Sequence, residues 1–193
     1  MGKLISSILI ANRGEIALRV IRACKEMKIK SIALYSDEDL RSKHVKSADE
    51  AYYLGPPAPT KSYLNLDKII EIAESAGAEA IHPGYGFLSE NETFAAKCEE
   101  RGIIFIGPTS EAMALTGDKM KCKEIMKKAE VPTIPGSDDI LEEVDKAVEI
   151  AQEAGYPVLL KSAYGGGGRG IRFADDEKKL REAFEMAAAE SSA

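Results

Sequence analysis

The chain has 193 residues, of which 45% are hydrophobic, 6% aromatic and 30% charged, and its formal net charge is −6. This length suits one large domain, or one full domain and a smaller piece, with enough apolar residues for a sizeable core. An acidic chain lacks the basic face with which general nucleic-acid binders neutralise phosphates. No stretch approaches the ~18 apolar residues of a membrane span. We therefore expect neither nucleic acid nor a membrane as partner.

The cysteine pattern indicates a reducing compartment. Cys24, Cys98 and Cys122 are widely spaced, odd in number and form no C-x-x-C pair. Such thiols are typical of a cytosolic protein and not of a disulfide framework or zinc site. The N-terminal apolar run is shorter than the ~7–15 residues of a signal-peptide core. The sequence therefore predicts a cytoplasmic protein.

Short apolar runs alternate with segments of helical periodicity along the N-terminal part of the chain. The expected elements, in chain order, are a strand at 7–11, a helix at 14–27, strands at 30–36 and 51–55, a helix at 65–77, a strand at 78–84, a helix at 91–102, a strand at 103–107 and a helix at 109–129 that is broken near Gly117. Repeated strand–helix units with apolar strands imply an α/β fold with a doubly wound, Rossmann-like parallel sheet.

Two of these helices carry specific signals. In the helix expected at 14–27, apolar residues at helical spacing predict a stripe that faces the core, formed by Ile16, Val20, Ala23, Cys24 and Met27. In the helix expected at 65–77, Asn65 is the predicted N-cap and Gly77 the predicted residue just past the helix end.

A Pro/Gly/Asp-rich stretch, VPTIPGSDD at 131–139, predicts a boundary between a first domain at 1–130 and a second at 131–193. The second is expected to contain a helix at about 141–154, a strand at 156–162, a strand at 170–174 and a helix at 175–190. Because a two-stranded sheet is marginal alone, we expect part of a small α+β domain that is incomplete.

The stretch LLKSAYGGGGRGIRFA, residues 159–174, joins the last two strands. Gly165, Gly167 and Gly170 match G-x-G-x-x-G, but a dinucleotide site needs a helix after the loop, and a strand follows here. A flexible linker would lie among polar residues, not between apolar strands. The remaining interpretation is a flap whose backbone N–H groups approach phosphate oxygens closely.

This flap supplies most of the candidate ligand-binding residues. We expect Lys161 to place an ammonium near the phosphates, and Arg169 either to clamp an anion or to solubilise the loop tip. The backbone contacts are predicted at Gly165, Gly166, Gly167 and Gly168.

Two loops after predicted strands leave alternatives open. In HPGYGFLSEN, His82 either acts as an acid–base group or forms a His-Pro turn bonded to the backbone, with Gly84 and Gly86 giving the tight bend and close approach. In ANRGE, Arg13 either joins a structural network with a carboxylate or contacts a substrate. His44, in a polar connection, receives no role.

Several stretches together carry a family resemblance. They are ILIANRGEIALRVIRACKE (8–26), HPGYGFLSEN (82–91), FIGP (105–108), GDK (117–119), KKAEVPTIPGS (127–137) and GYPVLLKSAYGGGGRGIR (155–172). In order and spacing they closely resemble the biotin carboxylase component of biotin-dependent carboxylases, of the acetyl-CoA, propionyl-CoA and pyruvate carboxylase type, within the ATP-grasp superfamily.

The resemblance implies a ligase that uses ATP and bicarbonate to form carboxyphosphate and then carboxylates biotin on a carrier protein. It implies a doubly wound N-terminal domain followed by an ATP-grasp flap. Lys119 of GDK and Lys161 match the family's two phosphate-contacting lysines, and Gly167 and Gly168 match its flap glycines. Tyr164 and Arg169 stand where other members carry glycine and lysine.

The resemblance also implies cofactors and partners. They are Mg²⁺ or Mn²⁺, biotin, a biotin carboxyl carrier protein or domain, a carboxyltransferase component, and a second copy of the chain bound through Arg19, Arg22 and Glu26. The family's adenine-contacting, metal, bicarbonate and biotin residues match no position here, so we expect no catalytic or metal-binding residue in this chain and negligible activity from it alone. The alternative is a non-catalytic dimerisation or assembly module that keeps the N-terminal fold.

Overall fold

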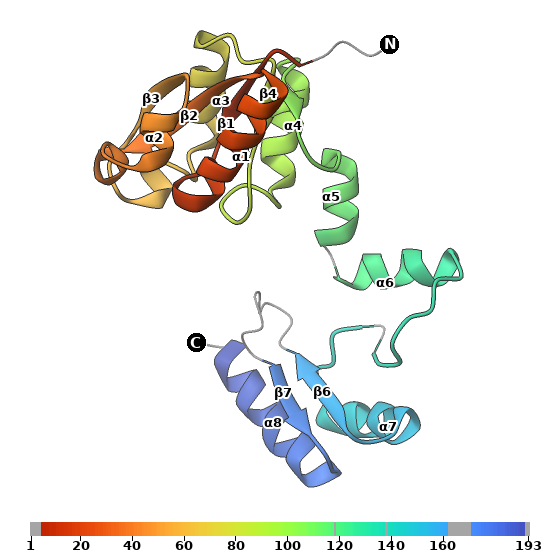
Figure 1. Cartoon of the computed structure of the whole chain (residues 1–193). Helices are drawn as coiled ribbons and strands as arrows, with labels where there is room; N and C mark the ends of the chain where they lie inside the picture. The colour runs from red at the N-terminus through yellow and green to blue at the C-terminus, as the bar shows by residue number, and fades with distance from the viewer. Residues whose placement is uncertain (1–4, 118, 138, 162–170, 192–193) are drawn as a thin grey trace. The chain divides into compact units, whose positions relative to one another are not determined.

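The computed structural model describes residues 5–117, 119–137, 139–161 and 171–191, which form two compact units (Figure 1). Unit 1 spans Met1–Gly117 and unit 2 spans Asp118–Ala193. The units therefore divide between Gly117 and Asp118, whereas the sequence placed the domain boundary between residues 130 and 131. Each unit has a hydrophobic core of its own.

Unit 1 alternates strands and helices, as the sequence predicted. Its elements are β1 (Ser7–Ile10), α1 (Gly14–Met27), β2 (Lys30–Ser36), α2 (Lys43–Ser47), β3 (Glu50–Gly55), α3 (Leu66–Ser75), β4 (Ala80–His82), α4 (Glu92–Glu100), β5 (Ile104–Phe105) and α5 (Ser110–Gly117). Helix α2 and two short 3-10 helices, η1 (Asp37–Asp39) and η2 (Pro59–Lys61), lie in stretches for which no element was predicted.

The five strands form one sheet in the order β3-β2-β1-β4-β5, and all four neighbouring pairs are parallel. The chain builds one side of the sheet with β2 and β3 and then returns past β1 to add β4 and β5. This order confirms the predicted doubly wound parallel sheet, whose topological switch lies between β1 and β4.

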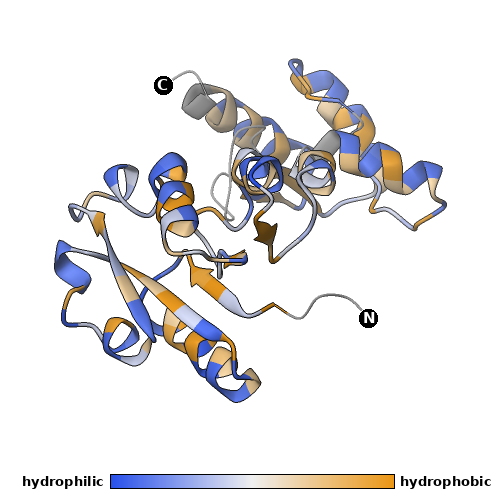
Figure 2. Ribbon diagram, turned by 90° about the horizontal axis from the view of Figure 1, so that it is seen from above, coloured by the Kyte–Doolittle hydropathy of each residue, from blue (hydrophilic) through white to orange (hydrophobic). Residues whose placement is uncertain are grey.

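Both faces of the sheet are covered, which explains why its strands are apolar at successive positions. Ile8 and Ile10 of β1 pack on the α1 side with Ile21, whereas Leu9 packs on the opposite side with Phe94 of α4. Figure 2 shows hydrophobic and hydrophilic residues side by side on the helices, as expected of helices with one buried face.

The buried stripe of α1 differs from the predicted one. Its buried residues are Ala17, Ile21 and Cys24, spaced at i, i+4 and i+7, while Ala23 is exposed and Met27 is 67% exposed. The prediction was therefore right at Cys24 and wrong at Ala23 and Met27. Apolar residues occur on two adjoining sides of this helix, and contact with the sheet decides which side is buried.

The predicted ends of α3 are confirmed. The Asn65 side chain accepts a hydrogen bond from the backbone N–H of Lys68 at 3.1 Å, and Gly77 has φ +65° just past the helix. Helices α5 and α6 (Lys119–Lys128) lie on either side of residue 118, which is outside the described residues, so the predicted break near Gly117 stays a prediction.

Unit 2 is a small α+β assembly. It contains α6, α7 (Val144–Ala154), β6 (Val158–Lys161), β7 (Ile171–Ala174) and α8 (Glu177–Ser191). Strands β6 and β7 are antiparallel, and their inner side chains pack with those of α7 and α8 in one core. In the part of the chain that the structure describes, no helix is long and apolar enough to span a membrane.

Candidate functional site

The residues predicted to contact phosphates lie on unit 2, and the structure describes only some of them. Lys161 is the last residue of β6 and is exposed. Lys119 is the first residue of α6, and its side chain is not among the described groups. Residues outside the described ranges are Gly165, Gly166, Gly167, Gly168 and Arg169. Their contact with phosphate stays a prediction.

The strands on either side of the glycine-rich segment form a hairpin. Leu159 pairs with Phe173 and Lys161 with Ile171, in antiparallel register. Residues 162–170 therefore connect strand to strand, which confirms the observation that argued against a dinucleotide fingerprint.

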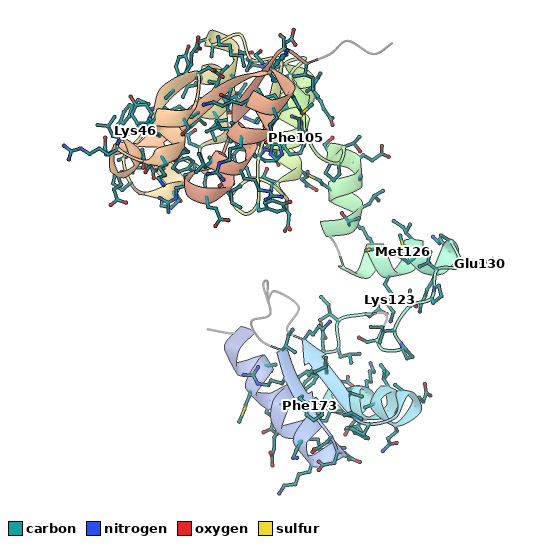
Figure 3. The ribbon with its side chains drawn as sticks, viewed as in Figure 1. Lys46, Phe105, Lys123, Met126, Glu130 and Phe173 are labelled. Atoms are coloured by element: carbon teal, nitrogen blue, oxygen red, sulfur yellow. The ribbon has the colours of Figure 1, made fainter. Side chains whose placement is uncertain are left out.

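The two faces of this hairpin differ sharply. Ala174 is fully buried against the helices, whereas Leu159, Ile171 and Phe173 are 58%, 44% and 60% exposed. Figure 3 shows Phe173 on the strand pair of unit 2. Because side chains alternate along a strand, the exposed residues share one face with Lys161. We call Leu159, Lys161, Ile171 and Phe173 the open hairpin face.

The open hairpin face combines two kinds of chemistry. Its three apolar side chains provide a surface on which a planar ring can pack, and the Lys161 ammonium lies at the end next to residues 162–170. A nucleotide needs both, since its base is aromatic and its phosphates are anionic. The face is therefore a candidate wall of a nucleotide site.

At the switch point of unit 1, a buried side chain links the loops that follow β1 and β4. In open α/β sheets this crevice, outside the carboxyl ends of the strands, is the usual ligand site. Here Asn12, which follows β1 and is 3% exposed, occupies it. Its Nδ2 donates to the carbonyl oxygens of Pro83 and Tyr85 at 2.8 and 2.9 Å, and its Oδ1 accepts from the backbone N–H of Arg13 at 2.9 Å.

The loop after β4 depends on a close approach at Gly84. Gly84 has φ +68°, and a Cβ atom placed there would lie 2.6 Å from both Asn12 Nδ2 and Ile16 Cγ2. The backbone N–H of Gly84 donates to His82 Nδ1 at 2.9 Å. This contact confirms the backbone-bonded His-Pro turn, and burial lowers the pKa of His82, which favours the neutral, accepting ring.

Arg13 belongs to a structural network, as one of the two interpretations predicted. Its Nη1 lies 3.9 Å from Asp39 Oδ2, an oxygen that also accepts from Ser36 Oγ at 2.7 Å and from the Tyr63 hydroxyl at 2.8 Å. Burial alone would raise the pKa of Asp39, but the hydrogen bonds from Ser36 and Tyr63 and the Arg13 charge outweigh it and lower that pKa. Burial and the Asp39 carboxylate together raise the pKa of Tyr63.

The Arg13 guanidinium lies beside a stacked pair of aromatic rings. Its Cζ lies 5.7 Å from the ring centroids of both Tyr63 and Phe87, which stack at 5.1 Å. Phe87 holds this position with φ +43°, a strained conformation for a bulky residue. Asp39, Tyr63 and Phe87 were not singled out from the sequence, because the contacts that join them connect distant parts of the chain.

His44 has a structural role that the sequence did not reveal. The residue is fully buried, its Nδ1 accepts from the backbone N–H of Gly14 at 3.3 Å, and its Nε2 therefore carries the proton that it donates to Leu34 O at 3.2 Å. Burial lowers its pKa. His44 thus ties α2 to the start of α1 and to β2 as a neutral ring.

The predicted dimer residues Arg19, Arg22 and Glu26 are all exposed on α1, and the exposed Met27 adjoins them in sequence. Among the described side chains, no group of three or more His, Cys, Asp or Glu residues is placed to hold a metal ion.

Comparison with known families agrees with the division into units. The model described as "Biotin carboxylase, N-terminal domain" matches residues 4–113. The model described as "Carbamoyl-phosphate synthase L chain, ATP binding domain" matches residues 118–193.

Similar proteins are carboxylases and their components. The chain is 57% identical to the 2-oxoglutarate carboxylase small subunit of Hydrogenobacter thermophilus, over 93% of this chain and 38% of that protein. It is 51% identical to biotin carboxylase 1 of Bacillus subtilis, over 92% of this chain and 39% of that protein. The chain thus spans about two fifths of the length of these relatives.

Solved structures show the same fold. The biotin carboxylase–β-γ-ATP complex from Campylobacter jejuni has a TM-score of 0.88 and 51% identity, covering 97% of this chain and 42% of that one. The biotin carboxylase domain dimer of Hydrogenobacter thermophilus 2-oxoglutarate carboxylase, in complex with MgADP, ADP and bicarbonate, has a TM-score of 0.86 and 54% identity, covering 96% and 41%.

The close approach at Gly84 leads to a matched pair of substitutions. We expect Gly84→Ala to lower the free energy of unfolding by about 3 kcal/mol or more, because the new Cβ clashes with Asn12 and Ile16 in addition to straining the backbone. Gly86 has a similar φ, +70°, but a Cβ atom added there would have nothing within 4 Å. Gly86→Ala should therefore lower the free energy of unfolding by only ~1 kcal/mol. Urea denaturation measures both, and equal losses would contradict the steric role of Gly84.

The two buried histidines lead to a pH prediction. Because burial lowers the folded-state pKa of His44 and His82 below the unfolded value of about 6.5, their stabilising effect is complete above that pH and is lost as pH falls through the folded values. The free energy of unfolding should fall between pH 7.5 and 5.5, by at most about 1.4 kcal/mol per pH unit for each histidine. His44→Asn should remove part of that slope, and a flat profile for the unsubstituted chain would contradict the prediction.

Proposed function

Because the chain belongs to the biotin carboxylase family, we propose that it forms the N-terminal part of an ATP-dependent ligase that carboxylates biotin on a carrier protein with bicarbonate. The observation that carries this proposal on the structural side is the open hairpin face of unit 2. It presents Lys161 beside three exposed apolar side chains, next to the glycine-rich segment. Three unpaired thiols support the proposal that this happens in the reducing cytoplasm.

We propose that different groups of unit 2 bind the adenine and the phosphates of ATP. The sequence led us to expect adenine contacts only outside this chain, whereas the exposed apolar residues of the open hairpin face are now proposed to pack against adenine. The two lysines and the flap hold the phosphates. The phosphate-binding groups are Lys119, Lys161, the backbone N–H groups of Gly165, Gly166, Gly167 and Gly168, and Arg169. Backbone N–H groups and ammonium groups suit this task because both donate charge-assisted hydrogen bonds to phosphate oxygens.

ATP supplies the phosphoryl group that activates bicarbonate, and this chain's own groups only bind and orient it. Phosphoryl transfer also requires a metal ion that clamps the developing charge. We propose that the Mg²⁺ or Mn²⁺, bicarbonate and biotin sites belong to a part of the family fold outside this chain, which spans about two fifths of its relatives. The carrier protein or domain and the carboxyltransferase component are the proposed partners.

A second candidate function is supported by α1. Its exposed face carries Arg19, Arg22 and Glu26, and charges of both signs on one patch can pair across a two-fold axis. One of the similar structures is a biotin carboxylase domain dimer. The chain would then act as a dimerisation or assembly module without catalysis, and it would bind no ATP.

ATP titration separates the two candidates. We expect the chain to bind ATP weakly, with a dissociation constant near 1 mM, because one wall of the site gives few contacts. Lys161→Ala and Lys119→Ala should each weaken ATP binding by about tenfold, as expected for a lost charge-assisted hydrogen bond, and should leave adenosine binding unchanged. Phe173→Ala should weaken both ligands.

Saturation-transfer NMR of ATP and adenosine measures these differences. Lys146→Ala, which removes an exposed lysine of α7, is the matched control and should have no effect. Failure to bind ATP at millimolar concentration would support the assembly module instead.

The proposed lack of a metal site gives a kinetic expectation. The purified 193-residue chain should show no bicarbonate-dependent ATP hydrolysis above background, because its lysines and backbone groups cannot replace the metal clamp. A phosphate-release assay with ATP, Mg²⁺, bicarbonate and free biotin measures this rate. Turnover close to that of a full-length family member would contradict the proposal.

A further inference from the structure

One surface of unit 1 takes no part in the features described so far. The segment 40–47 includes the turn after η1 and helix α2, and it carries three cations, Arg41, Lys43 and Lys46, with no Asp or Glu. All three residues are exposed. Figure 3 shows Lys46 at the end of unit 1 that α2 forms. We call these three residues the α2 cations.

The carboxylates near this segment in sequence are mostly engaged elsewhere. Asp39 accepts from Ser36 and Tyr63 inside the unit. Asp49 accepts from the N–H and hydroxyl of Ser31 at 2.8 and 2.6 Å.

Two further carboxylates nearby also interact with other residues. Glu50 pairs with Lys30 at 2.7 Å, and Asp37 is hydrogen-bonded to the Tyr53 hydroxyl. Glu38, exposed in η1, is the acid of this region for which the described contacts give no partner.

The α2 cations themselves are not neutralised. Across the described ranges, none of the three has a carboxylate within 4.0 Å, whereas many of the other surface lysines and arginines do. Although the chain has a net charge of −6, this segment keeps a local surplus of positive charge. Such a surplus attracts an anionic partner and steers its approach.

The backbone under these cations is fixed. His44, which lies between Lys43 and Lys46, is fully buried and bonded to Gly14 N and Leu34 O. Ser42 N donates to Asp39 O at 2.8 Å, and the partly buried Ala48 packs against the core cluster on the α1 side of the sheet. A surface whose backbone is already ordered loses little backbone entropy when a partner binds.

From this arrangement we infer that the α2 cations form a docking surface for an acidic protein segment. Leu40, 55% exposed beside Arg41, gives that partner an apolar contact at the edge of the charged patch. Residues 40–47 include no Phe, Tyr or Trp, so this surface lacks the aromatic platforms on which single-stranded nucleic acids stack. The inference does not depend on ATP binding by unit 2.

A labelled peptide of ten glutamates is the probe, and fluorescence anisotropy in 50 mM NaCl measures its binding to the full 193-residue chain. The triple variant R41E/K43E/K46E should bind the peptide at least tenfold more weakly. The control variant K61E/K146E/K178E makes the same change in net charge at dispersed exposed sites. Its affinity for the peptide should be at least fivefold higher than that of the α2 variant. If the Glu variant loses its folded circular dichroism spectrum, R41Q/K43Q/K46Q replaces it, with K61Q/K146Q/K178Q as its control.

Three results would overturn the inference. The first is no peptide binding to the unsubstituted chain at 0.5 mM, and the second is an equal loss in both triple variants. The third is equal affinity for a ten-nucleotide oligothymidine, which would indicate general polyanion attraction and not an acidic protein partner.

Discussion

A single carboxamide joins the loops that follow β1 and β4 in unit 1. Asn12 follows β1, the strand that pairs with both β2 and β4, and its side chain holds the loop after β4 through two carbonyl oxygens. This bridge fits only because Gly84 has no Cβ. The loop fixed in this way carries Phe87, which stacks on Tyr63, and Tyr63 in turn bonds Asp39. The polar network at the carboxyl edge of the sheet therefore depends on the contact between Asn12 and Gly84.

The same contact bears on where a ligand can bind. A doubly wound sheet ordinarily leaves its switch-point crevice open to ligands. Here the crevice is occupied by Asn12, whereas unit 2 leaves three apolar side chains and Lys161 exposed on one strand face. The proposed nucleotide site is therefore assigned to the antiparallel hairpin of unit 2 and not to the parallel sheet.

Local signals in the sequence were enough to predict the strand and helix order, the parallel sheet, the caps at Asn65 and Gly77, and the strand–loop–strand setting of the glycines. These features depend on periodicity and on residues close together in the chain. The burial of His44 and the contact of Asp39 with Tyr63 could not be predicted from the sequence. His44 bonds to Leu34, 10 residues away, and Tyr63 bonds to Asp39, 24 residues away. The buried side of α1 was misjudged for a related reason, since only contact with the sheet distinguishes Ala17 from Ala23.

The stability of unit 2 has to come from its own core and not from the proposed ligand. At an ATP concentration equal to its dissociation constant, binding would stabilise the folded state by only about 0.4 kcal/mol. A two-stranded sheet is itself marginal in water. The packing of Val148, Ala151 and Leu180 from α7 and α8 against the inner hairpin face must therefore keep the strands together. The outer hairpin face is then not needed for the core, and its apolar side chains are available to a nucleotide or another protein surface that covers them.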